Sequence, residues 1–270
     1  MWWKLLLIVP LAIYVVIAAV MFFAQTSLLF PAGQIGAAGP PPPGSERLEL
    51  AASAGERLVG LHIPPARGEG DLLILGFAGN AWNAASAAEY LHDLFPEAHV
   101  AAFHYRGYAP SGGAPDAVAM QQDALLIHDF VKARLRPGRT IAIGLSIGSG
   151  IAPYLAARRP LDGLVLVTPF DSLADLTAGH YPWLPVRLLL RHRMEPAAEL
   201  RATRLPVAIL AGARDTLVRP ARTDALRRAV PNLVFDRTIA GATHNDIYDR
   251  PEFRRAMGEA LDRLLSEPRT

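Results

Sequence analysis

Short apolar runs alternate with helical patterns along most of this 270-residue chain. We predict strands in the apolar runs at residues 58–63, 72–77, 100–103, 141–145, 164–168, 207–211 and 233–239. We predict helices at residues 84–94, 118–135, 149–157, 223–229 and 252–265. Nearly all-apolar strands that alternate with helices are typical of a mostly parallel sheet covered on both faces. The sequence therefore predicts one α/β domain.

The N-terminal segment is far more apolar than the rest of the chain. Residues 5–23 carry no charge, and no charged side chain occurs between Lys4 and Glu46. A helix over residues 5–23 would rise close to the ~30 Å thickness of a hydrocarbon core. This favours an uncleaved membrane anchor over residues 1–30. A cleaved signal peptide and a buried core helix are the alternatives, but the segment lacks small residues at its end and has no polar face.

The residues on either side of this segment predict its orientation in the membrane and the bounds of the domain that follows. Lys4 would keep the N-terminal end on the cytoplasmic side, so the chain would be a single-pass membrane protein with its main domain in the periplasm or another extracytoplasmic space. Four consecutive prolines within residues 31–45 predict a semi-rigid spacer. The α/β domain is then expected over residues 46–270, with a small cap at residues 171–204.

Composition excludes several kinds of function. The chain has no cysteine, which removes disulfide frameworks, thiolate catalysis and cysteine-based metal sites. Its 27 Lys and Arg are nearly balanced by 25 Asp and Glu and form no basic run with interleaved aromatics, so we expect no nucleic-acid partner. No two histidines have metal-ligand spacing, and we expect neither a metal nor a cofactor.

One turn carries the signature of a nucleophile. The predicted strand at 141–145 leads into Gly-Leu-Ser-Ile-Gly, with Ser146 at its centre, and a helical pattern follows. A G-x-S-x-G turn between a strand and a helix exposes the serine hydroxyl in a strained conformation. A phosphate-binding loop would need a lysine that this turn lacks. Ser149 lies nearby, but inside the start of the helix.

A nucleophilic serine needs a base, and the base needs an acid to orient it. After such a turn the expected order along the chain is serine, acid, histidine. Asp215 and His244 fit this order, and each follows a predicted strand. Asp171 and Asp246 are competing acids, but Asp215 is preferred because it lies one strand before the histidine.

Acyl transfer also needs backbone N–H groups that stabilise an oxyanion. One donor is expected from Ile147, the residue after the nucleophile. The other is expected from Asn80, in the turn after the predicted strand at 72–77, where Gly79 allows close approach of the backbone. The alternative is that Asn80 merely caps the following helix.

With Ser146, Asp215 and His244 in these turns after strands, the chain resembles the α/β-hydrolase superfamily. It is most similar to a membrane-anchored branch that includes protein depalmitoylases, lysophospholipid lipases and bacterial proteins of unknown substrate. The resemblance rests on QTSLLFPAG, GNAWN, YRGY, GLSIGSG, TPFDSL and THND. Two positions depart from the branch: Ala78 replaces a histidine in the oxyanion turn, and Ala109 replaces the glycine that ends its YRGYG loop.

The resemblance implies a membrane-tethered serine hydrolase that cleaves carboxylic esters or thioesters through an acyl-enzyme intermediate. Its substrate would be a small-molecule ester, an acyl lipid or an acyl protein. The predicted cap mixes apolar residues with arginines, which suits an acyl chain or a membrane interface beside an anionic head group. A serine peptidase of the same fold and a tethered binding module without catalytic activity remain alternatives.

Overall fold

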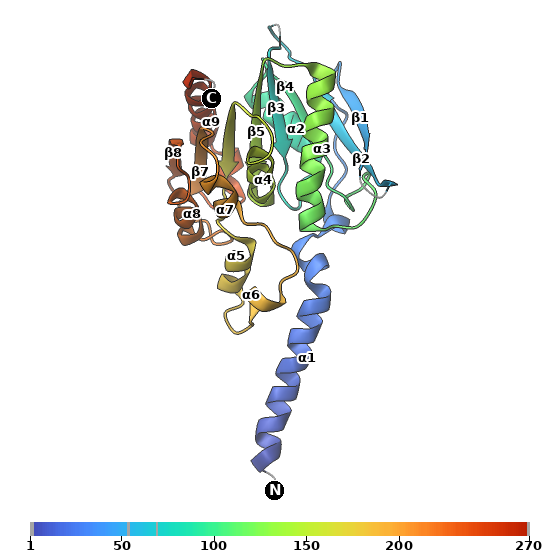
Figure 1. Cartoon of the computed structure of the whole chain (residues 1–270), viewed down its shortest axis with the longest axis vertical. Coiled ribbons are helices and arrows are strands. Elements are labelled where there is room, and N and C mark those ends of the chain that lie inside the picture. Colours follow the sequence, from blue (N-terminus) through green and yellow to red (C-terminus); the bar gives the residue numbers. More distant parts are fainter. Residues whose placement is uncertain (1–2, 53–54, 69, 269–270) are drawn as a thin grey trace.

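Eight strands form one mixed sheet in a computed structural model of the chain, which describes residues 3–52, 55–68 and 70–268 (Figure 1). The strands are β1 Glu46–Ala51, β2 Arg57–Ile63, β3 Leu72–Phe77, β4 His99–Phe103, β5 Arg139–Leu145, β6 Gly163–Val167, β7 Val207–Gly212 and β8 Leu233–Ile239. Their order is β1-β2-β4-β3-β5-β6-β7-β8. β2 pairs antiparallel with β1 and β4, and the other neighbours are parallel. The predicted α/β class is confirmed.

Helices cover both faces of this sheet. The α-helices of the described residues are α1 Trp3–Leu29, α2 Ala84–Leu94, α3 Ala117–Leu135, α4 Ala152–Ala156, α5 Leu173–His180, α6 Val186–Leu189, α7 Pro196–Arg201, α8 Pro220–Arg227 and α9 Pro251–Ser266. Side chains of α2 and α9 belong to one buried apolar cluster, whereas those of α3, α4 and α7 belong to the other. The sheet therefore lies between two separate cores, as the nearly all-apolar strands predicted.

Strand β1 was not expected from the sequence. Its residues alternate in burial, and only Leu48 is fully buried. β1 lies at the edge of the sheet and pairs only with β2, so one side of the strand is free of neighbours. An edge strand of this kind lacks the continuous apolar run that marks the central strands.

The N-terminal helix α1 projects from the domain as a long rod (Figure 1). By length and composition Leu6–Leu29 could cross a membrane, and a signal sequence would pass the same test. None of its most apolar window is buried, which argues against a core helix. The side chain of Lys4, on which the predicted orientation depends, lies outside the described part of the chain.

The residues directly after α1 pack on the domain. The Phe30 side chain is 3% exposed and belongs to the same apolar cluster as Leu48 in β1. Ala32 and Ile35 pack against this cluster, and the Asn83 side chain donates a hydrogen bond of 2.9 Å to the Gly36 carbonyl. The start of the predicted spacer is thus attached to the α/β domain, and a domain boundary at residue 46 stays a prediction.

Removing the Phe30 side chain tests whether the end of α1 is part of the folded domain. We expect Phe30→Ala to lower the free energy of unfolding by about 3 kcal/mol, because it leaves a cavity in the core. Phe23→Ala is the matched control, since Phe23 is 77% exposed on α1. Denaturation of both full-length variants in detergent measures the effect. Equal stability of the two variants would show that the domain folds without this contact.

Candidate active site

Ser146 lies at the end of β5, in the middle of the sheet. It begins a short 3-10 helix, Ser146–Gly150, which leads into α4. Its φ angle is +51°, in the left-handed region that residues with a side chain rarely adopt. Such strain is retained only where the surrounding structure enforces it, and it is frequent at active sites. The predicted strand, turn and helix around Ser146 are all present.

Two glycines make this tight turn possible. A Cβ atom on Gly144 would lie 2.6 Å from the Gly148 carbonyl oxygen. A Cβ atom on Gly148 would lie 2.2 Å from the carbonyl oxygen of Phe77, at the end of β3. Both distances are far below van der Waals contact. The turn after β5 therefore packs directly against the end of β3, and only glycine fits at both positions.

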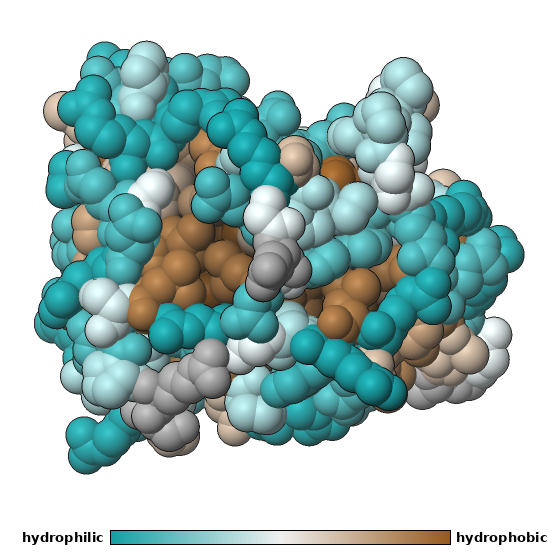
Figure 2. Space-filling model, turned by 90° about the horizontal axis from the view of Figure 1, so that it is seen from above, coloured by the Kyte–Doolittle hydropathy of each residue, from teal (hydrophilic) through white to brown (hydrophobic). Residues whose placement is uncertain are grey.

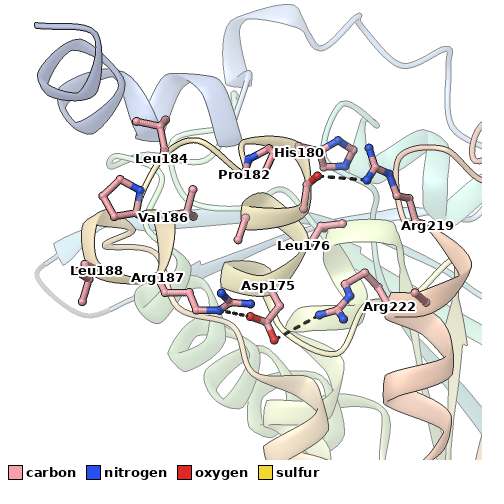
Figure 3. A pocket seen from close by; sticks show the side chains of 14 residues that line it. Asp175, Leu176, His180, Pro182, Leu184, Val186, Arg187, Leu188, Arg219 and Arg222 are labelled. Carbon is pink, nitrogen blue, oxygen red and sulfur yellow. Dashed lines mark hydrogen bonds and ion pairs between the residues drawn. The ribbon is translucent and has the colours of Figure 1, made fainter. Parts of the chain in front are cut away.

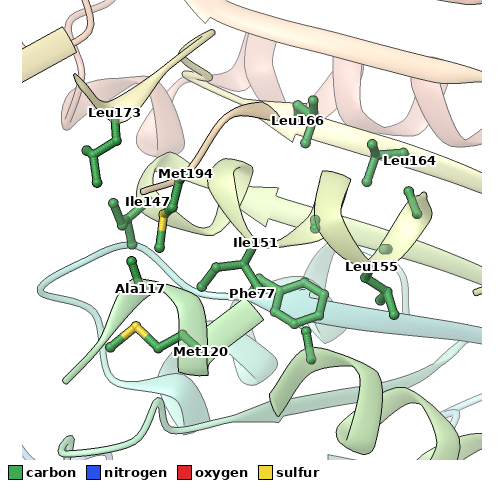
Figure 4. Packing of buried hydrophobic residues seen from close by; sticks show 14 of the residues in the cluster. Phe77, Ala117, Met120, Ile147, Ile151, Leu155, Leu164, Leu166, Leu173 and Met194 are labelled. Carbon is green, nitrogen blue, oxygen red and sulfur yellow. The ribbon is translucent and has the colours of Figure 1, made fainter. Parts of the chain in front are cut away.

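Buried side chains support the turn from below (Figure 4). Ile147 and Ile151 follow Ser146 and join the same apolar cluster as Phe77 and Met120. Met194, from the segment after α6, packs over Gly150, where a Cβ atom would lie 2.6 Å from the methionine sulfur. Dense packing of this kind resists relaxation of a strained backbone.

Three side chains from separate turns form a chain of hydrogen bonds. Ser146 Oγ lies 2.8 Å from His244 Nε2, and His244 Nδ1 lies 2.7 Å from Asp215 Oδ2. The other oxygen of Asp215 accepts hydrogen bonds from the backbone N–H groups of Leu217 and Val218, at 2.9 and 2.8 Å. Asp215 and His244 are both buried. The structure thus brings together the three residues that the sequence singled out.

The competing residues make other contacts. Ser149 is buried, and its hydroxyl donates to the Ser146 carbonyl at 2.6 Å. The Asp171 carboxylate accepts from Arg222 at 3.2 Å, and burial raises its pKa. The Asp246 carboxylate accepts from the Thr243 backbone at 2.8 Å and so shapes the turn that carries His244.

The turn after β3 borders the same cleft. A Cβ atom on Gly79 would lie 3.9 Å from Ser146 Cβ, so this backbone passes next to Ser146. Asn80 also lines the cleft. It is Asn83, whose side chain accepts from the Ala85 N–H, that caps helix α2. Asn80 therefore does not have the capping role that was its alternative.

Two tyrosines and the end of α1 hold this turn in place. The Tyr105 hydroxyl donates to the Ala78 carbonyl at 2.8 Å, and the Tyr108 hydroxyl donates to Asn80 Oδ1 at 2.8 Å. The Asn80 amide donates in turn to the carbonyl of Leu29, the last residue of α1. No pattern in the sequence predicted these contacts. The YRGY motif, which contains both tyrosines, was the only sequence feature that pointed to this region.

The cleft above Ser146 has a volume of about 480 Å³ and largely apolar walls. Trp82 and Tyr248 form one side, with ring centroids 5.1 Å apart, and Leu217 borders it as well. Burial raises the pKa of Tyr248 to about 12, so this side chain stays neutral near pH 7. An apolar, uncharged wall of this kind suits the hydrocarbon part of a ligand.

Comparison with known sequences identifies the family. The sequence model of the α/β-hydrolase fold matches residues 72–192. An uncharacterized protein of Mycobacterium tuberculosis is 32% identical over 248 residues, which cover 89% of this chain and 86% of that protein. The lysophosphatidylserine lipase ABHD12 of Danio rerio is 34% identical over 97 residues, 32% of this chain and 25% of that protein. The chain belongs to the α/β-hydrolase superfamily.

Solved structures show the same fold. A Pyrococcus furiosus esterase aligns with a TM-score of 0.68 and 17% identity, covering 85% of this chain and 96% of the esterase. A membrane phospholipase A, described as a bacterial virulence factor, aligns with a TM-score of 0.62 and 16% identity. That alignment covers 98% of this chain and 97% of the phospholipase, so most of α1 lies within it. At these identities the likeness establishes the fold alone.

A single methyl group tests how tightly the Ser146 turn is packed. We expect Gly148→Ala to lower the free energy of unfolding by roughly 2 to 3 kcal/mol, because the added Cβ meets the Phe77 carbonyl. Gly258→Ala is the control: nothing lies within 4 Å of its Cβ position in α9, and alanine stabilises a helix interior by about 0.5 to 1 kcal/mol. Urea denaturation compares the two. A neutral Gly148→Ala would contradict the close contact with β3.

Proposed function

We propose that this α/β-hydrolase cleaves carboxylic esters or thioesters with Ser146 as nucleophile, His244 as base and Asp215 as orienting acid. The observation that supports this most strongly is the chain of hydrogen bonds from Ser146 Oγ through His244 to Asp215, at 2.8 and 2.7 Å. These distances are those at which a base can take the proton of its nucleophile.

The mechanism follows from the position of each group. His244 Nε2 accepts the proton as Ser146 Oγ attacks the acyl carbonyl, and Asp215 stabilises the charged imidazole and fixes its tautomer. The backbone N–H groups of Ile147 and Asn80 stabilise the negative oxygen that forms. His244 then protonates the leaving group and an acyl-serine remains. Water, activated by His244, releases the acid and restores Ser146.

The walls of the cleft and the relatives favour an acyl substrate. Trp82, Leu217 and Tyr248 give the cleft apolar surface beside Ser146, which favours an acyl chain over a charged group. The relatives include a lysophosphatidylserine lipase, and the structural neighbours include esterases and a phospholipase. We therefore place acyl lipids and small esters first among the substrates, with acylated proteins as a further class.

We also propose that α1 anchors the enzyme in a membrane. Leu6–Leu29 is long and apolar enough to span a bilayer. Lys4 precedes this stretch, and the next charged residue is Glu46, so the positive-inside rule places the N-terminal end in the cytoplasm. Residues 46–270, with a cap at 171–204, then act on the extracytoplasmic side, connected by residues 31–45.

Substitution of the three residues tests the mechanism. We expect Ser146→Ala and His244→Ala to lower kcat for p-nitrophenyl esters by at least about 1,000-fold, and Asp215→Asn by about 10,000-fold. The unfolding midpoint is measured in parallel to confirm that each variant folds. Ser266→Ala, at an exposed hydroxyl on α9, is the control and should retain full activity.

Four results would contradict this assignment. Retained activity in Ser146→Ala would exclude Ser146 as the nucleophile. Loss of activity in Asp171→Asn together with full activity in Asp215→Asn would move the acid to Asp171. A wild-type enzyme that refuses acyl esters and thioesters from acetyl to palmitoyl but cleaves amides would be a peptidase, and one with no activity on any of them would support a binding module.

The tyrosine contacts to the oxyanion turn predict a separation of kcat from KM. Tyr108→Phe removes the hydroxyl that holds the Asn80 side chain, so we expect kcat to fall about ten-fold with little change in KM, because an oxyanion donor acts mainly in the transition state. Tyr154→Phe is the control, since Tyr154 lies on α4 with its ring packed under Arg158 and does not line the cleft. A fall in stability with unchanged kcat would show that Tyr108 is only structural.

A further inference from the structure

Residues 181–190, named here the cap tip, lie alongside the apolar helix α1. The Tyr14 hydroxyl donates a hydrogen bond of 3.1 Å to the Trp183 carbonyl, and the two rings are 6.3 Å apart. Nearer the domain, the Gln25 amide donates to the Leu189 carbonyl at 3.3 Å. Figure 1 shows α5 and α6 on the same side of the domain as α1. The cap tip therefore follows α1 from Gln25 down to Tyr14.

This contact lies deep along the part of α1 that we propose to span the membrane. Tyr14 lies nine residues before Phe23, the last residue of the 5–23 segment that the sequence predicts to cross the hydrocarbon core. At ~1.5 Å per residue this separation is ~14 Å, close to half of a ~30 Å hydrocarbon core. If α1 crosses a bilayer, the Trp183 carbonyl that Tyr14 contacts cannot lie outside it. This inference rests on the proposed membrane span.

The cap tip has the surface that such a position requires. Outside α1, six large hydrophobic side chains are exposed in the described residues, and three of them lie in these ten residues. They are Tyr181, Trp183 and Leu188, and Leu188 is 85% exposed. By contrast, the end of the molecule away from α1 has a largely hydrophilic rim, with hydrophobic residues gathered in its recesses (Figure 2). Aromatic side chains at such a site are typical of a membrane interface.

Many backbone polar groups of the cap tip are satisfied without water. Within the tip, Leu184 N–H donates to Tyr181 at 3.0 Å and Leu190 N–H donates to Val186 at 2.8 Å. Pro182 and Pro185 have no N–H to satisfy. Tyr14 and Gln25 of α1 provide donors for two carbonyls of the tip, as described above. Lipid offers no partner to a polar backbone group, so internal pairing of this kind is what burial in hydrocarbon demands.

The cap tip contains one charged side chain, Arg187, which joins a charged cluster with Asp175 in α5 and Arg222 in α8. The Arg187 guanidinium donates to Asp175 in α5 at 2.6 Å, and Arg222 lies 3.3 Å from the same carboxylate. Figure 3 shows these three side chains together along the lower part of the view, with Leu184, Val186 and Leu188 at its left and Leu188 beside Arg187. Arginine side chains can extend from an apolar surface to the level of the lipid head groups.

We propose that the cap tip is inserted into the leaflet on the catalytic side of the membrane, next to α1. The inserted surface is Tyr181, Trp183 and Leu188. An apolar groove lies between the cap and α1, and its lining includes Phe22, Leu28, Tyr181 and Leu184. In this position the groove opens to acyl chains rather than to water. The enzyme is then held by two elements, and its cap meets lipid directly.

Spin labels can measure how deeply the cap tip lies in the membrane. The chain has no native cysteine, so a single introduced cysteine is labelled specifically. Leu188→Cys is labelled with a nitroxide in the full-length protein, reconstituted into nanodiscs of phosphatidylcholine and phosphatidylglycerol. Val16→Cys, at an exposed position of α1, is the hydrocarbon reference. Leu126→Cys, at an exposed position of α3, is the water reference. The measured quantity is the ratio of collision rates with oxygen, which dissolves in lipid, and with a water-soluble nickel chelate.

We expect the oxygen-to-nickel ratio at Leu188 to be several-fold higher than at Leu126 and close to that at Val16. A ratio at Leu188 equal to that at Leu126, with a high ratio at Val16, would overturn the insertion of the cap and leave the membrane anchor intact. A low ratio at Val16 would overturn the anchor itself and the insertion that rests on it. Neither result would affect the assignment of Ser146, which the hydrolysis of soluble esters tests separately.

Discussion

The Ser146 turn packs directly against the end of β3, and this contact positions the other groups of the candidate site. Ser146 has a positive φ angle, and Gly148 packs against the Phe77 carbonyl with no room for a Cβ atom. Because β3 and β5 are hydrogen-bonded neighbours, this contact fixes the turns that follow both strands. Ser146 and the proposed oxyanion turn at Gly79 are thereby held next to each other. Strain in the turn persists because buried apolar side chains pack beneath it.

The N-terminal helix contributes to the same arrangement. Its last carbonyl, on Leu29, accepts a hydrogen bond from the Asn80 side chain, and Phe30 is buried in the core. Near the same end of the helix, the Thr26 hydroxyl lies 2.8 Å from Nε2 of His192, in the segment after α6. α1 thus contacts both the oxyanion turn and the segment that follows the cap tip. If α1 is the membrane anchor proposed above, it contributes to the geometry of the candidate site as well as to the location of the protein.

Most of the sheet could be predicted because its inner strands are apolar and buried on both faces. The expected strands 72–77 and 233–239 have the observed bounds, and the others differ by one or two residues at an end. β1 could not be predicted, because its charged and apolar residues alternate, whereas the other edge strand, β8, begins with three consecutive apolar residues. The first two residues of the expected helix 149–157 belong instead to the 3-10 helix Ser146–Gly150, and the α-helix begins only at Ala152.

The candidate site could be predicted only in part. Ser146, Asp215 and His244 follow strands in a known order, so their chain positions alone indicate that they meet. The contacts of Tyr105, Tyr108 and Leu29 with the oxyanion turn join residues 27, 28 and 51 positions apart. Pairings at such separations arise from tertiary packing, which no local pattern specifies. The same reason explains why the position of the cap tip beside Tyr14 was not foreseen.

Labelling with a fluorophosphonate tests directly whether Ser146 is a nucleophile activated by His244, because this reagent reacts with a serine only when a base activates it. The labelled full-length protein would be digested, and the modified peptide sequenced by mass spectrometry. We expect one adduct per chain, on Ser146, and we expect this adduct to be lost in His244→Ala. An adduct on Ser149, or unchanged labelling of Ser146 in His244→Ala, would contradict the proposed roles of these residues. A folded wild-type protein that does not react at all would contradict catalysis by a serine nucleophile.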